Sequence, residues 1–260
     1  MKKTCIVLIP LYKSELKAEE MASVEHNLAV LGNRYPVRFL IPEGVDFSAI
    51  ESRFPGVELV RVSDAWLGTR CGIAGYNRMM LSGAFYDLFS DYDYLLICQP
   101  DVWLFRDELD KWCGRGYDYV GAPWPEKPIY RCWPIRLYLK LHRALTPSKK
   151  ILRSDLFNRV GNGGLSLRRI APFRAACSRY AEEIEHFLGE THALYNEDTF
   201  WALVPEGWHY PSAEEACRFA FDLKPELALQ LNGGELPFGC HGWFRPERRA
   251  FWNGYIPQKQ

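Results

Sequence analysis

The chain has 260 residues, and its 32 Lys and Arg balance its 32 Asp and Glu, so the formal net charge at pH 7 is zero. An apolar content of 48% without net charge allows enough burial for folding, which excludes disorder, and the lack of excess cations argues against a nucleic-acid binder. No run approaches the ~18–20 apolar residues that cross a bilayer. The unusual number is the aromatic content, 9 Trp, 14 Tyr and 15 Phe, which either fills a core or forms a surface that stacks against rings.

The eight cysteines are spread along the chain, and the closest two are fifteen residues apart, so no pair has zinc-ligand or C-x-x-C spacing. Cys5 and Cys98 lie in apolar runs, where cysteine behaves as a small hydrophobe. The first apolar stretch is interrupted by Pro10 and lacks a small-residue cleavage site, so we expect a buried strand there and not a signal peptide. These features predict a cytoplasmic protein with reduced thiols.

Strand and helix signals alternate over the first hundred residues. The expected strands are 5–9, 37–41, 57–62 and 94–98, and the expected helices are 14–31, 47–54 and 73–89. Such alternation with short links predicts right-handed crossovers and a mainly parallel, Rossmann-type α/β sheet flanked by helices. Ligands of these sheets bind beyond the carboxyl ends of the strands, which directs attention to residues 99–101.

The pattern is looser after Asp101. We expect helices at 107–113, 170–188 and 197–204, strands at 117–121 and 163–167, and a loop from Pro237 onward. Residues 131–159 contain eight Lys and Arg but one acid, Asp155, which is the strongest charge asymmetry of the chain. This segment mixes apolar and cationic residues as an interfacial helix on an anionic membrane would. The alternative is a solvated segment whose charges face the acidic remainder of the protein.

Two motifs, QPD and GNGG, lie next to predicted strands. In QPD, Asp101 either turns the chain and caps a helix beginning near Arg106, or presents a carboxylate to a metal or a diphosphate. In GNGG, Asn162 precedes Gly163 and Gly164, and this pair indicates either a tight turn before a strand or a backbone that approaches a ligand closely.

Two further motifs contain titratable groups. Glu197 and Asp198 begin a predicted helix, where they either cap it electrostatically or supply a general base at the rim of a pocket. His241 is bracketed by glycines beside Trp243, and its imidazole is either structural or a metal ligand next to a carboxylate.

The order of these motifs resembles that of the GT-A fold glycosyltransferases. More narrowly, the chain resembles an uncharacterised bacterial family of glycosyltransferase-like domains. The strings that carry this resemblance are GYNRMMLSGAFYDLF, YLLICQPDVWLF, GYDYVGAPW, VGNGGLSLR, NEDTFW and PFGCHGW. The resemblance covers nearly the whole chain and implies a single GT-A-like domain over 1–260. Its parts would be a nucleotide-sugar half at 1–122, a basic insertion or flexible loop at 123–160, and a smaller acceptor and catalytic half at 161–260.

The resemblance also implies a donor site. Its nucleotide-sugar-binding residues would be Pro10, Tyr12, Tyr76, Asn77, Gln99 and Asp101. Asp101 corresponds to the last acid of a D-x-D motif that binds Mn²⁺ or Mg²⁺, and His241 corresponds to the late histidine that completes the metal shell. Gln99 stands where the first acid would be, so an uncharged amide replaces the carboxylate that would contact the ribose.

On the acceptor side, Asp198 corresponds to the catalytic base of inverting members, and Glu197 to a neighbour that orients the base or the acceptor. The acceptor-binding residues would be Trp124, Asn162, Gly163, Gly164 and Trp243. The flat C–H faces of sugars make tryptophans suitable platforms, and Trp103 and Trp201 are further candidates, although core packing is the favoured explanation for each tryptophan.

The activity that the resemblance implies is transfer of a sugar from a nucleotide-sugar donor to a hydroxyl of a glycan or lipid-linked glycan. This transfer would be metal-assisted and inverting, and it would serve polysaccharide or glycoconjugate biosynthesis in the cytoplasm or at the inner membrane leaflet. Gln99 motivates an alternative, a non-catalytic carbohydrate- or nucleotide-binding protein with a degenerate site. A sugar nucleotidyltransferase is a weaker alternative, because it would have a Gly- and cation-rich loop where this chain reads PLYKSEL.

Overall fold

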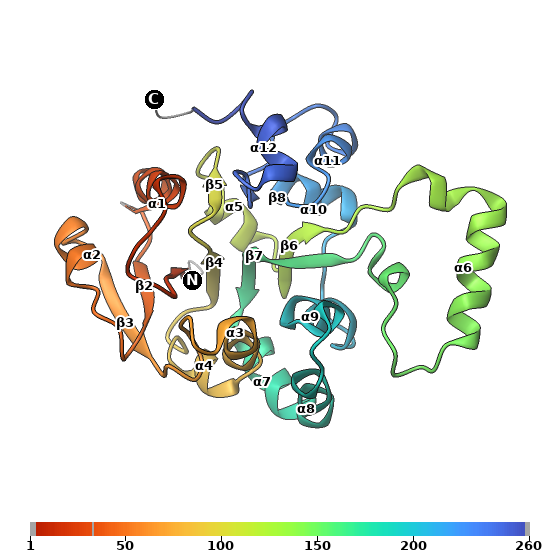
Figure 1. Cartoon of the computed structure of the whole chain (residues 1–260), viewed down its shortest axis with the longest axis horizontal. Helices are drawn as coiled ribbons and strands as arrows, with labels where there is room; N and C mark the ends of the chain where they lie inside the picture. The colour runs from red at the N-terminus through yellow and green to blue at the C-terminus, as the bar shows by residue number, and fades with distance from the viewer. Residues whose placement is uncertain (1–3, 33, 258–260) are drawn as a thin grey trace.

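The computed structural model describes residues 4–32 and 34–257, and a six-stranded sheet in the order β3-β2-β1-β4-β7-β6 lies at its centre (Figure 1). Its strands are β1 (Cys5–Pro10), β2 (Val37–Pro42), β3 (Glu58–Val62), β4 (Tyr94–Cys98), β6 (Tyr119–Pro123) and β7 (Val160–Arg169). The pairs among β1 to β4 are parallel, whereas β7 runs antiparallel to both β4 and β6. The predicted α/β fold with a mostly parallel sheet is confirmed.

Helices cover both faces of this sheet, and they account for its continuous apolar strands. Val7 and Ile9 of β1 enter one core cluster, while Ile6 and Leu8 enter another, because successive side chains of a strand point to opposite faces. The first cluster includes side chains of α1 (Ala18–Leu31), α2 (Ser48–Arg53), α5 (Leu109–Gly114) and α10 (Ala213–Phe219). The second includes side chains of α3 (Gly72–Met80), α4 (Gly83–Asp87), α7 (Ile170–Arg179), α8 (Ala181–Gly189) and α9 (Glu197–Leu203).

Two helices that the sequence predicts as continuous are interrupted. The helix expected at 73–89 ends at Met80 and restarts as α4, because Ser82 adopts an extended backbone. The helix expected at 170–188 is divided into α7 and α8 at Tyr180, whose ψ of 34° leaves the helical region.

A second, three-stranded sheet has the order β5-β9-β8 and corrects two sequence predictions. Asp101 does not lead into a helix near Arg106, since β5 (Val102–Leu104) follows it directly. The predicted loop after Pro237 contains β9 (Gly239–His241) and α12 (Pro246–Trp252), while β8 (Ala220–Phe221) and α11 (Pro225–Leu231) were not predicted. Val102 pairs with His241, so this small sheet brings His241 beside Asp101.

The basic segment forms ordered structure. It contains η1 (Pro128–Arg131), α6 (Trp133–Leu145) and η2 (Arg153–Leu156), and α6 projects from the rest of the molecule (Figure 1). A further short 3₁₀ helix, η3 (Ala193–Tyr195), precedes α9. Within the described ranges, no helix is long and apolar enough to cross a bilayer.

A buried ion pair joins the sheet to α9. The Arg168 side chain, on β7, is fully buried, and its Nη2 donates to Glu197 Oε1 at 3.0 Å. Its Nε donates to Ser166 Oγ and its Nη1 to the Tyr86 hydroxyl, each at 3.1 Å. Removing one partner of such a pair leaves an uncompensated buried charge, so the pair constrains the position of Glu197 on the sheet.

We therefore expect Arg168→Met to lower the free energy of unfolding by about 3–5 kcal/mol, because it leaves the Glu197 carboxylate buried without its cation. Adding Glu197→Gln should restore part of this loss, since the double variant buries no unpaired charge. Urea denaturation of the single and double variants measures both effects.

The matched control is Arg169→Met. Arg169 is the adjacent residue of β7, but it is half exposed and pairs with Asp118 at 3.3 Å, so its loss should cost about 0–1 kcal/mol. Equal destabilisation by the Arg168 and Arg169 substitutions would contradict the special role of the buried pair.

Candidate functional site

The candidate site lies at the carboxyl end of β4. Leu8 pairs with Ile97, and the same parallel register continued by two places brings Pro10 beside Gln99. The backbone N–H of Gln99 donates to the carbonyl of Gly164 at 3.0 Å, which attaches the end of β4 to the beginning of β7. This is the edge of the sheet at which the sequence predicts ligand binding.

Three polar side chains converge at this edge. His241 Nε2 lies 3.1 Å from Asp101 Oδ1 and 3.1 Å from Gln99 Oε1. Arg245, which follows β9, reaches Asp101 Oδ2 at 3.4 Å from the solvent side. The structure thus brings together Gln99, Asp101 and His241, three residues that the sequence singled out.

Asp222 belongs to the same cluster, and the sequence reasoning missed it. It directly follows β8 and is buried, with one carboxylate oxygen 3.5 Å from His241 Nδ1. The same carboxylate accepts hydrogen bonds from Asn162 Nδ2 and Arg248 Nη1. The signal that could have found it is an apolar run ending in an acid, Phe-Ala-Phe-Asp, which repeats the pattern of the β4 motif.

The charges of this cluster depend on one another. Burial alone would raise the pKa of Asp101, but the positive charge and hydrogen bond of His241, with a contribution from Arg245, lower it to about 2. Burial alone would lower the pKa of His241, but Asp101 and Asp222 overcome it and raise this pKa to about 10. At neutral pH the cluster therefore holds an imidazolium between two carboxylates.

Gly163 and Gly164 have a packing role in the structure. A Cβ on Gly164 would overlap the imidazole of His241, and a Cβ on Gly163 would lie 2.5 Å from Glu197 Oε1. These glycines let the two functional side chains pack directly on the backbone of β7. Close approach is confirmed, but it is to protein side chains, and an acceptor pocket bordered by Asn162, Gly163 and Gly164 stays a prediction.

Glu197 and Asp198 begin α9 next to this strand. Asn77 holds the start of the helix, because its Oδ1 accepts from the Glu197 N–H at 3.2 Å and its Nδ2 donates to Asn196 Oδ1 at 3.0 Å. The Glu197 side chain is buried against Arg168, whereas Asp198 is partly exposed. These adjacent carboxylates therefore have different environments. The side-chain amide of Asn77 makes hydrogen bonds within the protein, and its contact with a nucleotide stays a prediction.

The pKa of Asp198 is raised to about 7, first by burial and then by the negative charge of Glu197. The N–H of Thr199, which donates to Asp198 Oδ1 at 2.8 Å, opposes this shift. A carboxyl group with this pKa exchanges its proton near neutral pH, which is the property that general acid–base catalysis requires.

Some of the buried polar atoms without hydrogen-bond partners lie at or near these groups. They include the Tyr76 hydroxyl and Glu197 Oε2. Burial, followed by the charge of Glu197, raises the pKa of Tyr76, which keeps its hydroxyl protonated as a donor. Unsatisfied buried groups are rare in native proteins, so they mark a place where a ligand or water would supply the missing partners.

The structure contradicts the predicted sugar-stacking role for most of the candidate tryptophans. Trp243 is only 3% exposed, and its Nε1 donates to Ser23 Oγ at 2.8 Å, so neither ring face is open to a sugar. Trp103 and Trp201 are also buried in core clusters. Trp124 is partly exposed beyond the end of β6, and Tyr12 is exposed beyond the end of β1, so these two rings stay accessible to a ligand.

The donor set suits a divalent cation in part. Neighbouring ligands of one octahedral Mg²⁺ are about 3 Å apart, which is close to the separations of His241 Nε2 from Asp101 and Gln99. Among residues 4–32 and 34–257, however, no group of three or more His, Cys, Asp and Glu side chains is placed to hold a metal. Asp101 and His241, with the Gln99 amide, would leave the remaining positions to oxygens of a ligand.

Comparison with solved structures identifies the fold as that of the GT-A glycosyltransferases. The galactosyltransferase LgtC, in complex with donor and acceptor sugar analogs, gives a TM-score of 0.54 at 14% identity over 99% of this chain and 97% of that chain. Mouse xyloside xylosyltransferase 1, in its apo form, gives 0.51 at 10% identity over 92% and 97% of the two chains. The S. cerevisiae mannosyltransferase Ktr4p, in complex with GDP, gives 0.50 at 15% identity over 83% and 68%.

At these identities the structural likeness shows the fold alone. No curated protein matches the sequence. Residues 56–241 match the model of the family described as "Protein of unknown function (DUF5672)", and because this range covers well over half of the chain, the chain belongs to that family.

Proposed function

We propose that the protein is a glycosyltransferase that moves a sugar from a nucleotide-sugar donor to a hydroxyl of a glycan or lipid-linked glycan. The observation that carries this proposal is the arrangement at the end of β4. There, Asp101, His241 and Gln99 converge, and Asp198, an acid with a pKa of about 7, lies on the adjacent α9. The fold supports the proposal because its solved neighbours include sugar transferases with bound GDP or sugar analogs.

The donor would bind with its diphosphate toward Asp101, His241 and Arg245. When the bond to the anomeric carbon breaks, the leaving diphosphate gains negative charge, and cationic groups at this place would stabilise it. A Mn²⁺ or Mg²⁺ ion held by Asp101 and His241 would supply Lewis-acid stabilisation of that charge, and His241 would release its proton to bind the metal, because only the neutral imidazole is a ligand. Arg245 is half exposed and would contact the diphosphate from the solvent side.

The acceptor would lie on the side of Asp198. Its hydroxyl must lose a proton as it attacks, and Asp198 is the partly exposed acid whose pKa allows it to take this proton near pH 7. Attack from the face opposite the leaving group inverts the anomeric configuration. Glu197 would act as a positioning residue, because Arg168 and the Asn77 amide hold it and thereby hold α9.

The setting would be polysaccharide or glycoconjugate synthesis in the cytoplasm. A lipid-linked acceptor would present its hydroxyl at the inner leaflet, and the basic segment 131–159 would bring the enzyme to that surface. The rival, a binding protein with a degenerate site, is favoured by Gln99, which replaces an acid with an uncharged amide.

A thermal-shift screen of nucleoside diphosphates and sugar nucleotides, with and without Mn²⁺, tests the proposal, because a ligand that binds the native state raises its apparent stability. Calorimetry and release of the nucleoside diphosphate should follow for any ligand found. Binding without release would favour the rival, and absence of both binding and release would contradict the proposed function.

Asp198→Asn should lower kcat by about 10²–10⁴-fold, because it removes the base that accepts the proton of the acceptor. The affinity for the nucleotide sugar should stay within a few-fold, since the base acts on the acceptor. Transfer assays and calorimetry measure the two quantities, with Asp91→Asn, at an exposed site, as the control. Equal loss of binding and turnover would contradict this role.

The pH dependence of kcat/KM should reflect the same group. Transfer needs the Asp198 carboxylate, so the rate should rise with pH to a plateau with a midpoint near 7 and fall about tenfold per pH unit well below it. Glu197→Gln should move the midpoint downward, because it removes the like charge that raises this pKa. A wild-type midpoint near 4, the ordinary value of an aspartate, would exclude Asp198 as the base.

Asp101→Ala should remove the metal-dependent part of nucleotide binding, since Asp101 would be the carboxylate ligand of the cation. The measurement is the calorimetric affinity for the nucleoside diphosphate identified by the screen, with Mn²⁺ and with EDTA. Asp91→Ala is the matched control on the surface. An unchanged Mn²⁺ dependence in Asp101→Ala would show that the cation binds elsewhere or is not used.

A further inference from the structure

The exposed apolar side chains of the protein are concentrated on one segment. Of the eleven exposed large hydrophobic residues in the described chain, six lie in η1 and α6, namely Ile129, Trp133, Leu137, Tyr138, Leu141 and Leu145. Trp133 is 76% exposed and Leu145 is 85% exposed. Contiguous apolar surface of this kind is unusual on a monomer and marks an interaction site.

These residues form a stripe along α6. Trp133, Leu137, Leu141 and Leu145 are spaced four apart, which places them on one face of the helix, and we call this face the apolar stripe. The opposite face, with Ile135 and Leu139, is the half-buried one. No side chain of α6 is fully buried, so packing against the protein does not account for the apolar character of the helix.

The stripe is held in place from the C-terminal end of α6. Arg143 donates to the carbonyls of Thr146, Pro147 and Lys150 at 3.1, 2.7 and 2.8 Å, and to Asp155 Oδ2 at 2.7 Å. These bonds close the segment that follows the helix. The stripe is therefore presented on a formed helix that projects from the body of the molecule (Figure 1).

The charge around the stripe has one sign. Residues 127–153 contain eight Lys and Arg and no Asp or Glu, so the rest of the chain has 24 cations against 32 acids. Arg136 and Lys140 lie along one edge of the stripe, and Lys149 and Lys150 follow the helix. Within the part of the chain that the structure describes, none of these four forms an ion pair with a carboxylate.

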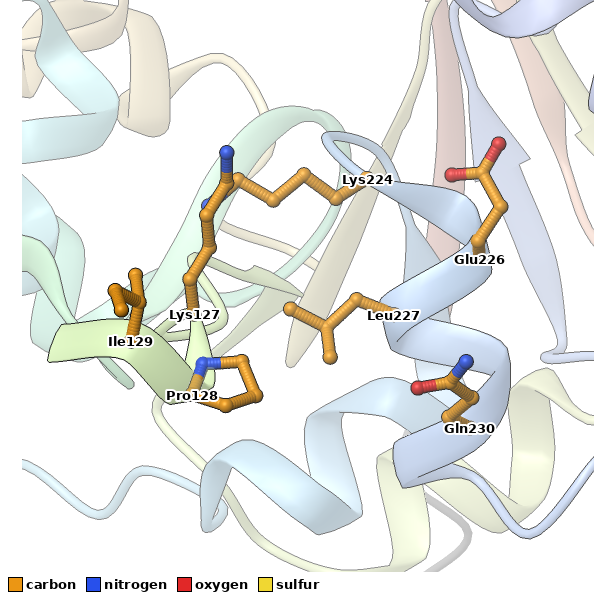
Figure 2. A pocket seen from close by; sticks show the side chains of 7 residues that line it. All are labelled: Lys127, Pro128, Ile129, Lys224, Glu226, Leu227 and Gln230. Atoms are coloured by element: carbon orange, nitrogen blue, oxygen red, sulfur yellow. The ribbon is translucent and has the colours of Figure 1, made fainter. Parts of the chain in front are cut away.

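A cavity of about 430 Å³ beside η1 adds to this positive region. Figure 2 shows the Lys127 and Lys224 side chains converging on one side of it, while Pro128 and Leu227 form an apolar wall. Burial, followed by the charges of Lys127 and Arg153, lowers the pKa of Lys224, whose ammonium donates to the carbonyl of Pro125 at 3.2 Å; Glu226 lines the same cavity. An apolar wall beneath two ammonium groups suits a phosphate attached to a hydrocarbon chain.

We propose that the apolar stripe docks on an anionic lipid bilayer, with its side chains at the boundary of headgroups and acyl chains and its cations on lipid phosphates. Long cationic side chains beside an apolar helical face are the pattern of interfacial helices. A second copy of the chain is a poorer occupant, because two stripes face to face would bring together cations without acids between them. The idea that docking brings the site to a lipid-linked acceptor rests on the proposed function. Docking on the bilayer itself does not, because vesicle binding does not require sugar transfer.

Sedimentation with vesicles tests the docking. The full-length protein should bind vesicles of equimolar phosphatidylcholine and phosphatidylglycerol, bind vesicles of phosphatidylcholine alone much more weakly, and lose affinity at high salt. Trp133→Ser with Leu141→Ser should weaken binding tenfold or more, since each apolar side chain contributes to burial in the bilayer. Arg136→Gln with Lys140→Gln should weaken binding to the anionic vesicles by about 30-fold.

Matched controls lie outside the segment. Leu88 is 52% exposed, close to the 54% of Leu141, so Leu88→Ser changes a comparable surface side chain, and Lys111→Gln removes a cation from α5. Neither control should alter vesicle binding. Equal effects of control and stripe variants, or equal binding to both kinds of vesicle, would overturn the proposal.

Analytical ultracentrifugation distinguishes membrane docking from the remaining explanation, which is dimerisation through the apolar stripe. A dimer that the stripe variants dissociate, without vesicle binding by the wild-type protein, would assign the stripe to a second copy and overturn the membrane proposal. Nucleotide binding in solution should be the same in wild type and stripe variants. Its absence in all of them would contradict the proposed transferase while leaving the vesicle result to decide the docking.

Discussion

The ion pair of Arg168 and Glu197 is the interaction on which the candidate site depends. It joins β7 to the start of α9 in a buried position, and breaking it leaves an uncompensated buried charge. Gly163 is part of the same constraint, because only a residue without a Cβ lets Glu197 lie against the strand. Asp198 is the next residue of the helix, so its place at the start of α9 is fixed by a pair in which it does not take part.

The same pair separates the chemistry of two adjacent acids. Glu197 is buried and neutralised by Arg168, whereas Asp198 is partly exposed and has a pKa raised to about 7 by burial and by Glu197 itself. Two carboxylates in different environments take different roles, one structural and one able to exchange a proton near neutral pH. His241 shows the corresponding effect for a cation, since Asp101 and Asp222 hold its charge in a buried position.

The local sequence pattern was sufficient to predict an element where that element is buried and long. The strand expected at 94–98 has those bounds in the structure, because five consecutive buried apolar residues have no other stable arrangement in a covered sheet. It was insufficient for β5, β8 and β9, which have two or three residues each and exist through pairing between distant segments, such as Val102 with His241. The glycine-rich context of Trp243 indicated a surface loop, yet its indole is bonded to Ser23, a partner that no local window contains.

The residues of the candidate site likewise differ in whether a local sequence pattern could identify them. Asp101 could be selected because it comes after a predicted strand, Asp198 because it lies at the start of a predicted helix and His241 because glycines bracket it, whereas Asp222 follows a strand of only two residues. The neutral net charge conceals a further separation, between the eight cations of 127–153 and the rest of the chain, which has 24 cations against 32 acids. A sum over the chain cannot detect a local excess of one sign. Because screening limits charge interactions to about 8–10 Å in physiological salt, a remote surface responds to its own charges and not to the total.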